Sequence, residues 1–590
     1  MFIEKIINGN FLAYDDNYID HRQFKSKVFA ISKSIIKSKN NSKKNIGIYL
    51  NRSVNALASI NACVINGVTY IPLNPKDPLK RTLEMIEQAE IEFILTEEIH
   101  SIFFSEHNIN TIFVEKLEFL QDEGEYDLRK NFSYILFTSG SSGAPKGVKV
   151  SSNALYNTLD AFNELYPTTS KDTWLYKTTY TFDVSLTEQF LWQLVGGNIA
   201  ILKDGDERDP LAIINSIEKN KVTHINFVPS MFRHFLQLLS KGNLEKVRSL
   251  KYIFLAGEPV LPEMIIEFRT LNTSIKIINL YGPTEAAIYA THYDLSLWDG
   301  KKNIPIGFPL KGVEIFVLDK YYKELPTLVP GEIFIAGISL ADEYIKNEQL
   351  TNSKFIINSD NQKRLYRTGD VGRVLLDGSI GFLGRKDNQI KLRGFRIELE
   401  EIENVLLKFV GIKDIVITQT SPGTTDNNLI AYYSGNNKID EEELDLHLKS
   451  YLPAYMIPQA IIYLSEIPRS SSGKLKRNEL PEFSIKNNAE IIKPINETQK
   501  KIQKIWSRVL KIEMEKISIK ENFFRLGGHS LNLIEISFFL QEEFGFNIGI
   551  NALYVNSTIK DLADQIEALI SLKESSKSEI SNELMDTITI

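Results

Sequence analysis

The sequence is poor in cysteine, since Cys63 is the only one among its 590 residues. A single thiol cannot form an internal disulfide, and it excludes the cysteine-rich sites that hold structural metals. Cys63 lies in an apolar stretch that predicts a core helix, where a buried thiol has a structural role. Any metal or redox chemistry must therefore come from other side chains.

Long hydrophobic runs, a leader peptide and an excess of basic residues are also missing. No apolar run approaches the length of a membrane span, and Met1–Ile7 lacks the basic region, apolar core and cleavage site of a secretory signal. The net charge is −7, from 68 basic and 75 acidic residues, which argues against nucleic acid or an anionic membrane as a partner. We expect a cytoplasmic globular protein of several domains.

Strand-like and helical segments alternate from about residue 45 to 285. This pattern predicts an α/β fold with parallel sheets covered by helices on both faces. The expected strands are Ile46–Leu50, Tyr70–Leu73, Phe93–Thr96, Ile199–Lys203, His224–Pro229, Tyr252–Ala256 and Ile275–Leu280. Ligands of such sheets bind beyond the carboxyl ends of the strands, so we expect the functional site there.

The pattern changes twice further along the chain. Short strands with glycine turns predict a small barrel or antiparallel sheet, and its strands are Val313–Leu318, Glu332–Ala336, Arg373–Leu376 and Ile380–Leu383. We predict a large lobe over 1–386, a small α+β lobe over 388–482, a linker over 483–496, an all-α four-helix domain over 497–570 and a flexible tail over 571–590.

A loop rich in glycine and hydroxyl groups follows the apolar strand Tyr134–Phe137. It is Thr138-Ser139-Gly140-Ser141-Ser142-Gly143, and it ends in Pro145-Lys146-Gly147. Glycines let backbone amides approach an anion, hydroxyls add donors, and the lysine adds a mobile positive charge. With a helix expected next, capped by Ser151 or Ser152, the segment predicts a strand–loop–helix phosphate cradle. The alternative is a solvated linker, and the spacing matches neither the P-loop nor the dinucleotide fingerprint.

Nine motifs in a fixed order resemble those of a nonribosomal peptide synthetase adenylation domain, of the adenylate-forming superfamily, followed by a peptidyl carrier domain. They are Thr138–Gly147, Phe182-Asp-Val-Ser185, Tyr281-Gly-Pro-Thr-Glu285, Gly331–Gly337, Tyr366-Arg-Thr-Gly-Asp370, Gly384–Glu398, Leu452–Pro458, Ser472-Gly-Lys474 and Phe523–Ser530. Each motif alone is weak, but the ordered series is specific. The resemblance implies that ATP and a carboxylate give an acyl-AMP and pyrophosphate, and that the acyl group then moves to a thiol.

The resemblance also implies a nucleotide site. Tyr281 would offer its face to adenine, Glu285 would bind Mg²⁺, and Asp370 would accept from the ribose hydroxyls. The implied set is Thr138, Ser139, Gly140, Ser141, Ser142, Gly143, Lys146, Gly257, Tyr281, Gly282, Thr284, Asp370 and Arg385. Taken alone, these three side chains could equally be a core tyrosine, a solvated helix-start glutamate and an Asx turn.

The implied catalytic residues are Lys474, Lys146 and Glu285. Lys474 would place a cation between the substrate carboxylate and the α-phosphate as these anions are brought together. Asp387 would be a hinge about which the small lobe swings, presenting Lys474 for adenylation and then the Lys391–Gly394 face for thiol transfer. The alternative for Lys474 is a solvated loop lysine.

Asp183 decides the substrate class, because the resemblance places its carboxylate opposite the α-ammonium of an amino acid. A fatty or aryl acid would leave this carboxylate buried and unpaired; an N-cap aspartate is the alternative role. The implied pocket is Asp183, Val184, Thr187, Asn226, Phe254, Ala256, Leu280, Ile288, Tyr289 and Lys474. No charge is left to pair an ionic side chain, so we predict a small neutral amino acid such as serine, threonine, cysteine, alanine or proline.

Ser530 follows Gly527-Gly528 and opens a helix predicted over 531–543. The resemblance implies that a phosphopantetheinyl transferase attaches 4′-phosphopantetheine to Ser530, where the phosphodiester meets the positive end of the helix dipole. The tether would raise the effective concentration of the thiol, so that the protein loads itself. The alternative is a plain N-cap serine.

Two positions depart from the pattern of the family. Ser142 stands where threonine is more usual, and both residues keep a hydroxyl group. Glu400 stands where the family usually has glycine. If the backbone geometry of that glycine matters, thiol transfer rather than adenylation would suffer.

Two other functions remain open. An acyl- or aryl-CoA ligase would share Glu285, Asp370 and Lys474, but Asp183 and the fused Ser530 carrier argue against it. A carrier scaffold with an inactive adenylation half is the second alternative, and the complete set of catalytic side chains argues against that.

We expect no condensation domain before residue 1 and no thioesterase after residue 590. We therefore expect a free-standing loading module in nonribosomal peptide or amino-acid-derived natural product (antibiotic) biosynthesis. Its aminoacyl thioester would pass in trans to a condensation or tailoring enzyme. A small activator protein is a further candidate partner.

Overall fold

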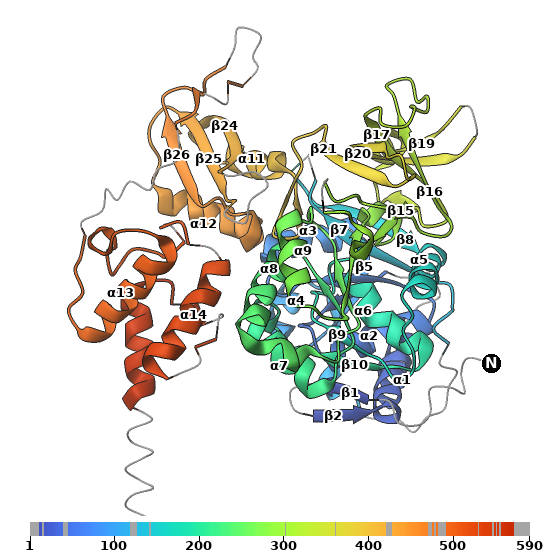
Figure 1. The fold of residues 1–590 in the computed structure, drawn as a ribbon, viewed down its shortest axis with the longest axis horizontal. Helices are drawn as coiled ribbons and strands as arrows, with labels where there is room; N and C mark the ends of the chain where they lie inside the picture. Colours follow the sequence, from blue (N-terminus) through green and yellow to red (C-terminus); the bar gives the residue numbers. More distant parts are fainter. Residues whose placement is uncertain are drawn as a thin grey trace, which may run out of the picture.

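A computed structural model describes residues 11–14, 17–38, 45–118, 127–140, 143–300, 303–359, 362–420, 427–469, 475–476, 479–481, 491–524, 526–528, 530–545, 548–549, 552–553 and 556–571. Figure 1 shows three parts, which we call the large lobe (11–385), the small lobe (388–481) and the helical region (491–571). The predictions for Ser141, Ser142 and Lys474, and for most of the linker and the tail, lie outside the described residues.

The first sheet of the large lobe has the strand order β18-β8-β7-β4-β3-β5-β6. Its parallel strands are β3 (Asn45–Tyr49), β4 (Thr69–Leu73), β5 (Ile91–Thr96), β6 (Asn110–Phe113) and β7 (Ser133–Thr138), with the antiparallel strands β8 (Lys146–Ser151) and β18 (Glu343–Tyr344) at one edge. Helices α2 (Val54–Ile65), α3 (Leu79–Gln88) and α4 (Ser101–Glu106) connect these strands. The predicted alternation is confirmed here.

The second sheet has the order β15-β14-β13-β12-β11-β9-β10-β1-β2. Its strands are β1 (Phe11–Tyr14), β2 (Asn17–Asp20), β9 (Thr173–Tyr176), β10 (Asn198–Ile201), β11 (His224–Phe227), β12 (Tyr252–Leu255), β13 (Lys276–Tyr281), β14 (Thr291–Asp294) and β15 (Phe308–Pro309). The helices of this half are α1 (His21–Ser38), α5 (Ser152–Leu165), α6 (Ser185–Val195), α7 (Pro210–Asn220), α8 (Pro229–Leu238) and α9 (Pro262–Thr270). Along the described ranges, every helix falls short of the length or apolarity that a membrane span needs.

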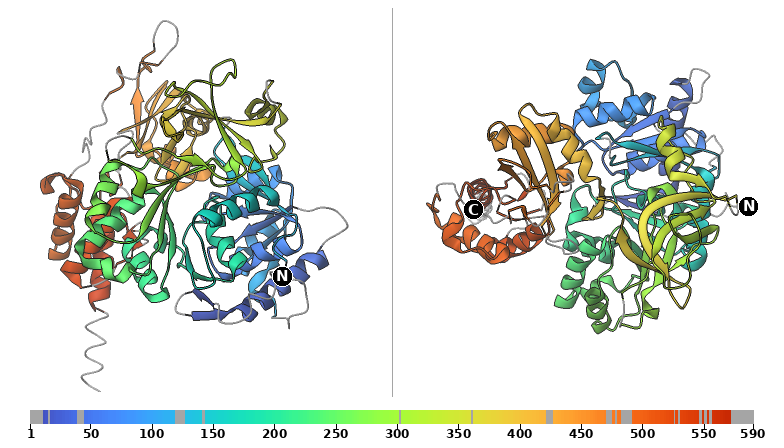
Figure 2. Two further views of the ribbon diagram at one scale, coloured as in Figure 1. Left: turned by 45° about the vertical axis from the view of Figure 1, so that its right-hand side comes forward. Right: turned by 90° about the horizontal axis from the view of Figure 1, so that it is seen from above.

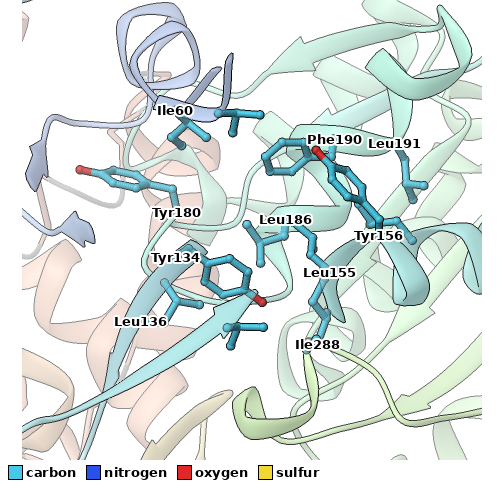
Figure 3. Close-up of a cluster of buried hydrophobic side chains, with 14 of the residues drawn as sticks. Ile60, Tyr134, Leu136, Leu155, Tyr156, Tyr180, Leu186, Phe190, Leu191 and Ile288 are labelled. Atoms are coloured by element: carbon cyan, nitrogen blue, oxygen red, sulfur yellow. The ribbon is translucent and has the colours of Figure 1, made fainter. Parts of the chain in front are cut away.

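One apolar core fills the space between the two sheets. Figure 3 shows part of it, with Ile60 of α2, Leu155 of α5 and Phe190 of α6 pointing toward side chains of the neighbouring strands. Helix α6 is buried on all sides from Ser185 to Gln193, and its polar side chains are enclosed together with the apolar ones. The two sheets therefore fold as one unit rather than as two domains.

The loop after β7 does not lead directly into a helix, so the predicted strand–loop–helix order is wrong. Strand β8 intervenes and pairs antiparallel with β7, and α5 begins only after it, at Ser152 with Ser151 as its N-cap. The alternation of buried Val148 and Val150 with more exposed neighbours has the period of a strand, which explains the difference. The loop thus joins the two strands of a β-hairpin, and α5 begins only after β8.

The antiparallel sheet predicted after residue 300 is present, with the order β16-β17-β20-β19 and β21 on β20. The bounds are β16 (Val313–Leu318), β17 (Gly331–Gly337), β19 (Phe355–Ile357), β20 (Arg364–Val374) and β21 (Ile380–Arg385), with helix α10 (Glu348–Lys354) preceding β19. The prediction of a strand over Arg373–Leu376 is wrong in its bounds, because the chain turns at Leu375–Gly378, where Gly378 has a φ of 83°.

The small lobe begins with a two-stranded ribbon of β22 (Ile390–Leu392) and β23 (Phe395–Ile397). A three-stranded sheet of β24 (Ile412–Gln419), β25 (Leu429–Gly435) and β26 (Ala460–Leu464) then packs against α11 (Leu399–Leu407) and α12 (Glu441–Tyr451). The α+β fold predicted for the small lobe is confirmed.

The helical region contains α13 (Glu497–Leu510), α14 (Ser530–Phe544) and a further helix over 559–571, which pack around Trp506 and Phe523. It touches both lobes, as Figures 1 and 2 show. The Gln459 side-chain amide of the small lobe donates to the Phe524 carbonyl at 3.2 Å. The ammonium of Lys241, just after α8, lies 5.3 Å from the centre of the Phe538 ring on α14.

Arg52 joins the two sheets of the large lobe at their carboxyl ends. Its guanidinium is 2% exposed and donates to the carbonyls of Leu202 and Lys203, at 2.8 and 2.7 Å, and to the Glu207 carboxylate at 2.8 Å. Arg52 follows β3 in one sheet, whereas its partners follow β10 in the other. A buried cation with several hydrogen-bonded partners fixes the relative position of the sheets.

We predict that Arg52→Met lowers the free energy of unfolding by about 3–5 kcal/mol, because it leaves the buried partners of the guanidinium unpaired. Urea unfolding followed by circular dichroism measures this change. Lys76→Met is the matched control, since Lys76 forms a half-exposed pair with Asp204 and its loss should cost less than about 1 kcal/mol. Equal effects of the two substitutions would contradict the role given to Arg52.

Candidate functional site

A cavity of about 1140 Å³ lies where the two lobes and the helical region meet. The loops after β7, β9, β11, β12 and β13 line it, as expected for the carboxyl ends of parallel strands. It brings together many of the predicted site residues, namely Thr138, Ser139, Asp183, Val184, Asn226, Ala256, Gly257, Tyr281, Gly282, Thr284, Ile288, Tyr289, Asp370 and Arg385.

The donors of the loop after β7 face the small lobe. The Ser139 hydroxyl donates to the Arg396 carbonyl at 2.8 Å, and the Gly140 amide donates to Oε2 of Glu401 at 2.9 Å. Lys146 pairs with Glu398 at 3.2 Å. Burial lowers the pKa of the Lys146 ammonium, and the nearby Arg396 adds to this shift. Carboxylates of the small lobe thus take the positions that the sequence predicts for phosphate oxygens.

Glu401 connects the two lobes through a second contact. Its Oε1 lies 2.5 Å from Nη1 of Arg81 on α3, and both side chains are buried. Burial alone would lower the pKa of Arg81, but the Glu401 carboxylate outweighs it and raises that pKa. The pair crosses the lobe interface without access to water, so removing either partner would leave a buried charge.

Glu285 is fully buried and has a partner on each oxygen. It accepts from the Tyr344 hydroxyl at 2.6 Å and from Nη1 of Arg396 at 2.8 Å. Burial would raise the pKa of Glu285, but Arg396 and Lys146 overcome it and lower the pKa to about 2. Within the described ranges no cluster of three metal-ligating side chains occurs. A cation at Glu285 would therefore need oxygen ligands from a bound molecule.

Asp370 lies between the large lobe and the connector to the small lobe. Its Oδ2 accepts from the Tyr281 hydroxyl at 2.5 Å and its Oδ1 from Nη1 of Arg385 at 2.6 Å. Arg385 in turn donates to Asp387 at 2.7 Å. The Lys391 ammonium lies 5.6 Å from the centre of the Tyr281 ring. Arg385 thus connects the predicted hinge residue Asp387 to Asp370, the predicted ribose ligand, through hydrogen bonds.

Asp183 lines the cavity with a buried carboxylate. Thr284 donates to its Oδ2 at 2.8 Å and the Val184 amide to its Oδ1 at 2.8 Å. Burial raises its pKa to about 6, against the effect of these two hydrogen bonds. It does not cap α6, whose N-cap residue is Val184. No described lysine, arginine or histidine forms an ion pair with Asp183, so its charge is available to a ligand cation.

A polar network lies beside Asp183 in the predicted pocket. The Asn226 amide donates to Thr187 at 3.0 Å and to Glu188 at 3.1 Å, and the Tyr289 hydroxyl donates to Asn226 at 3.3 Å. Glu188 is fully buried and also accepts from Thr178 at 2.7 Å. The sequence reasoning missed Glu188, because its charge is neutralised by residues that are distant in the chain.

Among the described residues of the predicted pocket, Thr187, Phe254 and Leu280 do not line the cavity, and Thr187 is fully buried beside Asn226. Phe254 is fully buried in a nearly parallel stack on Trp174, and Leu280 is buried in the same core. The loop before Tyr289 has an unusual backbone, since Ala287 and Ile288 have φ values of 48° and 79°. Such conformations are costly for residues with a side chain and are found at ligand sites.

Glu400 has an ordinary helical backbone. It lies in the first turn of α11 and does not have a positive φ, so the position does not require glycine. An acidic side chain in the first helical turn is favourable, and Glu400 accepts from the Asn388 side chain at 3.1 Å. The backbone at position 400 therefore has no conformation that would require glycine.

The far end of the cavity reaches the helical region. Gly528, Phe524 and Asn522 line it, and Ser530 is the first residue of α14, two positions after Gly528. Arg469 and Leu475, which flank the segment containing Lys474, do not line the cavity; Arg469 instead pairs with Asp414.

Several residues at the site escaped the sequence analysis. Arg81, Tyr344 and Glu188 carried no local signal, because their partners are far away in the chain. Arg396 and Glu398 stood within a quoted motif but had no assigned role. Glu258 lies two residues after the predicted strand Tyr252–Ala256, and that position was its only signal.

Comparison with known proteins gives two family matches. Residues 7–345 match the family described as AMP-binding enzyme, and residues 500–566 match the family described as phosphopantetheine attachment site. The first match alone covers more than half of the chain.

Two curated relatives and one solved structure illustrate the similarity. The zwittermicin A synthase ZmaJ of Bacillus cereus is 38% identical over 74% of this chain and 84% of its own length. Tyrocidine synthase 3 of Brevibacillus parabrevis is 32% identical over 94% of this chain, which spans less than a tenth (9%) of that protein. A nonribosomal peptide synthetase protein with adenylation and PCP domains, bound to a vinylsulfonamide inhibitor, has a TM-score of 0.79 at 21% identity, over 96% of each chain.

We predict that Arg81→Ala loosens the small lobe, because it leaves Glu401 buried without its cation at a cost of about 3–5 kcal/mol. Limited trypsin digestion should then cut the connector at Lys386 faster than in the wild-type chain. Lys346→Ala, which breaks an exposed pair with Glu90, is the control and should digest like the wild type. Unchanged digestion of the Arg81 variant would contradict the proposed anchoring.

Proposed function

Because this chain belongs to the AMP-binding enzymes and joins an adenylation domain of the nonribosomal peptide synthetase type to a phosphopantetheine carrier domain, we propose that it activates an amino acid and loads it onto its own carrier. ATP and the amino acid give an aminoacyl-AMP and pyrophosphate, and the carrier thiol then displaces AMP. The observation that carries this proposal is one continuous cavity, which is lined both by Asp183 and by Gly528, two positions before Ser530.

The amino acid is held by its α-ammonium at Asp183. A buried carboxylate with two hydrogen bonds and no ion pair in the described structure is stabilised when a cation enters. A fatty or aryl acid brings no such cation, which disfavours an acyl-CoA or aryl-CoA ligase.

The nucleotide lies between the loop at Thr138–Gly143 and Asp370. Backbone amides and hydroxyls of the loop, together with Lys146, bind the phosphates, while Tyr281 faces the adenine and Asp370 accepts from the ribose hydroxyls. Glu285 would hold Mg²⁺, which would supply positive charge to offset the repulsion between its carboxylate and the phosphates. The Lys474 ammonium stabilises the charge that develops as the carboxylate oxygen attacks the α-phosphorus and pyrophosphate leaves.

The two half-reactions use two positions of the small lobe. In the arrangement described above, Lys391 and Arg396 of the ribbon occupy the cleft, Glu401 holds the Gly140 amide, and Arg396 holds Glu285. This arrangement suits thiol transfer. A swing about Asp387 frees the loop and Glu285 for the phosphates and Mg²⁺, and it brings Lys474 to the cleft for adenylation.

The substrate is a small neutral amino acid. Glu188 is a buried acidic group beside Asn226, and Asn226 and Thr178 donate hydrogen bonds to it. The buried ammonium of Lys177 also stabilises the Glu188 carboxylate, so these two opposite charges offset each other and leave no net charge for an ionic side chain. Asn226 and the Tyr289 hydroxyl leave a polar group within reach of serine, threonine or cysteine, while alanine and proline need only apolar contacts.

We assign each proposed role to a part of the chain. Residues 1–386 and 388–482 form the two adenylation lobes, and 497–570 form the carrier that a phosphopantetheinyl transferase modifies at Ser530. The loaded amino acid passes to a condensation or tailoring enzyme, as the similarity to much longer synthases supports. A small activator protein bound to the adenylation lobes is a further proposed partner.

Pyrophosphate exchange across a panel of amino acids tests the proposed function. Lys474→Ala should abolish exchange, because it removes the cation of the adenylation step. Ser530→Ala should leave exchange intact and remove covalent loading, as measured by mass spectrometry of the intact protein. Exchange that depends on fatty or aryl acids instead of amino acids, or loss of exchange in the Ser530 variant, would contradict the assigned roles.

Substrate binding should depend on pH through Asp183. Its pKa of about 6 means that the carboxylate is ionised above pH 6 and neutral below it. We expect the KM for the amino acid to be flat above pH 6 and to rise up to tenfold per pH unit below it, because only the ionised form attracts the ammonium.

The control for this pH dependence is Asp183→Asn, which should have a high KM at every pH. A wild-type KM that stays constant from pH 7 to pH 5 would contradict the assignment of Asp183.

A further inference from the structure

Glu258 follows β12 and is fixed by the large lobe. Its Oε2 accepts from the Ser230 amide at 2.9 Å. Ser230 is in the first turn of α8, whose N-cap residue Val228 provides no side-chain cap, and Pro229 has no N–H to donate. The Glu258 carboxylate therefore satisfies a helix-end amide that has no other cap, and this contact lies wholly within the large lobe.

The other oxygen of Glu258 reaches the small lobe. Its Oε1 accepts from the Gly394 amide at 2.7 Å. Gly394 and Arg393 have φ values of 81° and 52°, and they form the tight turn at the tip of the β22–β23 ribbon. Arg393 also donates to the Asn428 side chain at 2.7 Å, which ties the tip to the rest of the small lobe.

The tip lies directly on the large lobe. A Cβ added to Gly394 would lie 2.4 Å from Cγ1 of Val228, and a Cβ on Gly257 would lie 3.7 Å from Cα of Gly394. A side chain at position 394 would therefore clash with Val228 in this arrangement. Because Gly394 lies beyond Asp387 and moves with the small lobe, its bond to Glu258 breaks when the lobe swings, whereas the bond to Ser230 remains.

We propose that Glu258 is a positioning residue for the thioester-forming step. One carboxylate oxygen stays on α8 and the other captures the ribbon tip, so Glu258 selectively stabilises the arrangement in which Lys391 and Arg396 occupy the cleft. Adenylation does not use this bond. The inference rests on the proposed function, because it assumes two half-reactions with two positions of the small lobe.

The test uses the full-length chain with phosphopantetheine on Ser530. Glu258→Ala should leave pyrophosphate exchange within twofold of the wild type. Single-turnover loading of the carrier, followed by rapid quench and mass spectrometry, should slow by about ten- to a hundredfold, the range for losing a hydrogen bond to a charged group. Glu258→Gln should also slow loading, because its amide nitrogen cannot accept from the second N–H. Glu263→Ala, at an exposed glutamate of α9, is the control and should leave both rates unchanged.

Hydrogen exchange of the substrate-free chain separates positioning from a structural role. The segment 390–397 should exchange faster in Glu258→Ala than in the wild type. If exchange changes only in α8, or if both half-reactions slow equally, Glu258 is merely a helix cap and the inference is overturned. Failure of the proposed function itself would look different, since the wild-type chain would then show no pyrophosphate exchange with any amino acid.

Discussion

Competition between anions for one set of buried donors is the constraint on which this structure depends. The Gly140 amide, Lys146 and Arg396 are hydrogen-bond donors at the interface between the lobes, and the carboxylates of Glu401, Glu398 and Glu285 hold them. A nucleoside triphosphate would present negatively charged oxygens to the same donors. On the proposed function, the small lobe in this position and the phosphates of ATP would compete for these donors, because each donor satisfies one anion well. Lobe movement would then be linked to the chemical state of the nucleotide.

The contacts that hold the small lobe on the large lobe determine how easily the small lobe can move. The Arg81–Glu401 pair is buried on both sides of the interface, so its desolvation offsets much of its Coulomb energy. The pair gives the interface between the lobes a defined geometry but little net stabilisation. Such a contact would suit the proposed function, in which it forms and breaks once in each catalytic cycle. The bond from Glu258 to the ribbon tip adds a second contact of this kind, and the continuous cavity leaves a route from the carrier to the substrate site.

Local periodicity and the ordered motifs made much of the fold and of the candidate site predictable from the sequence. The strands β3, β4 and β12 lie within one or two residues of their predicted bounds, because each is a short run of buried, mostly apolar residues. Strand β8 was missed, since the glycine-rich loop suggested a helix directly afterwards. Arg81, Glu188 and Glu258 were beyond reach for another reason: each acts through a partner that is distant in the chain. The place of Lys474 remains a prediction, because it lies outside the described residues.

The distance between the lobes tests the central claim most directly. Dyes on Ile102→Cys of α4 and Leu446→Cys of α12, both exposed positions in a chain whose single native cysteine is buried, report it by resonance energy transfer. The account predicts that a non-hydrolysable ATP analogue with Mg²⁺ shifts the transfer efficiency to a new value, and that AMP with the loaded carrier restores the value of the free protein. An efficiency that stays constant at saturating ATP analogue would contradict the account.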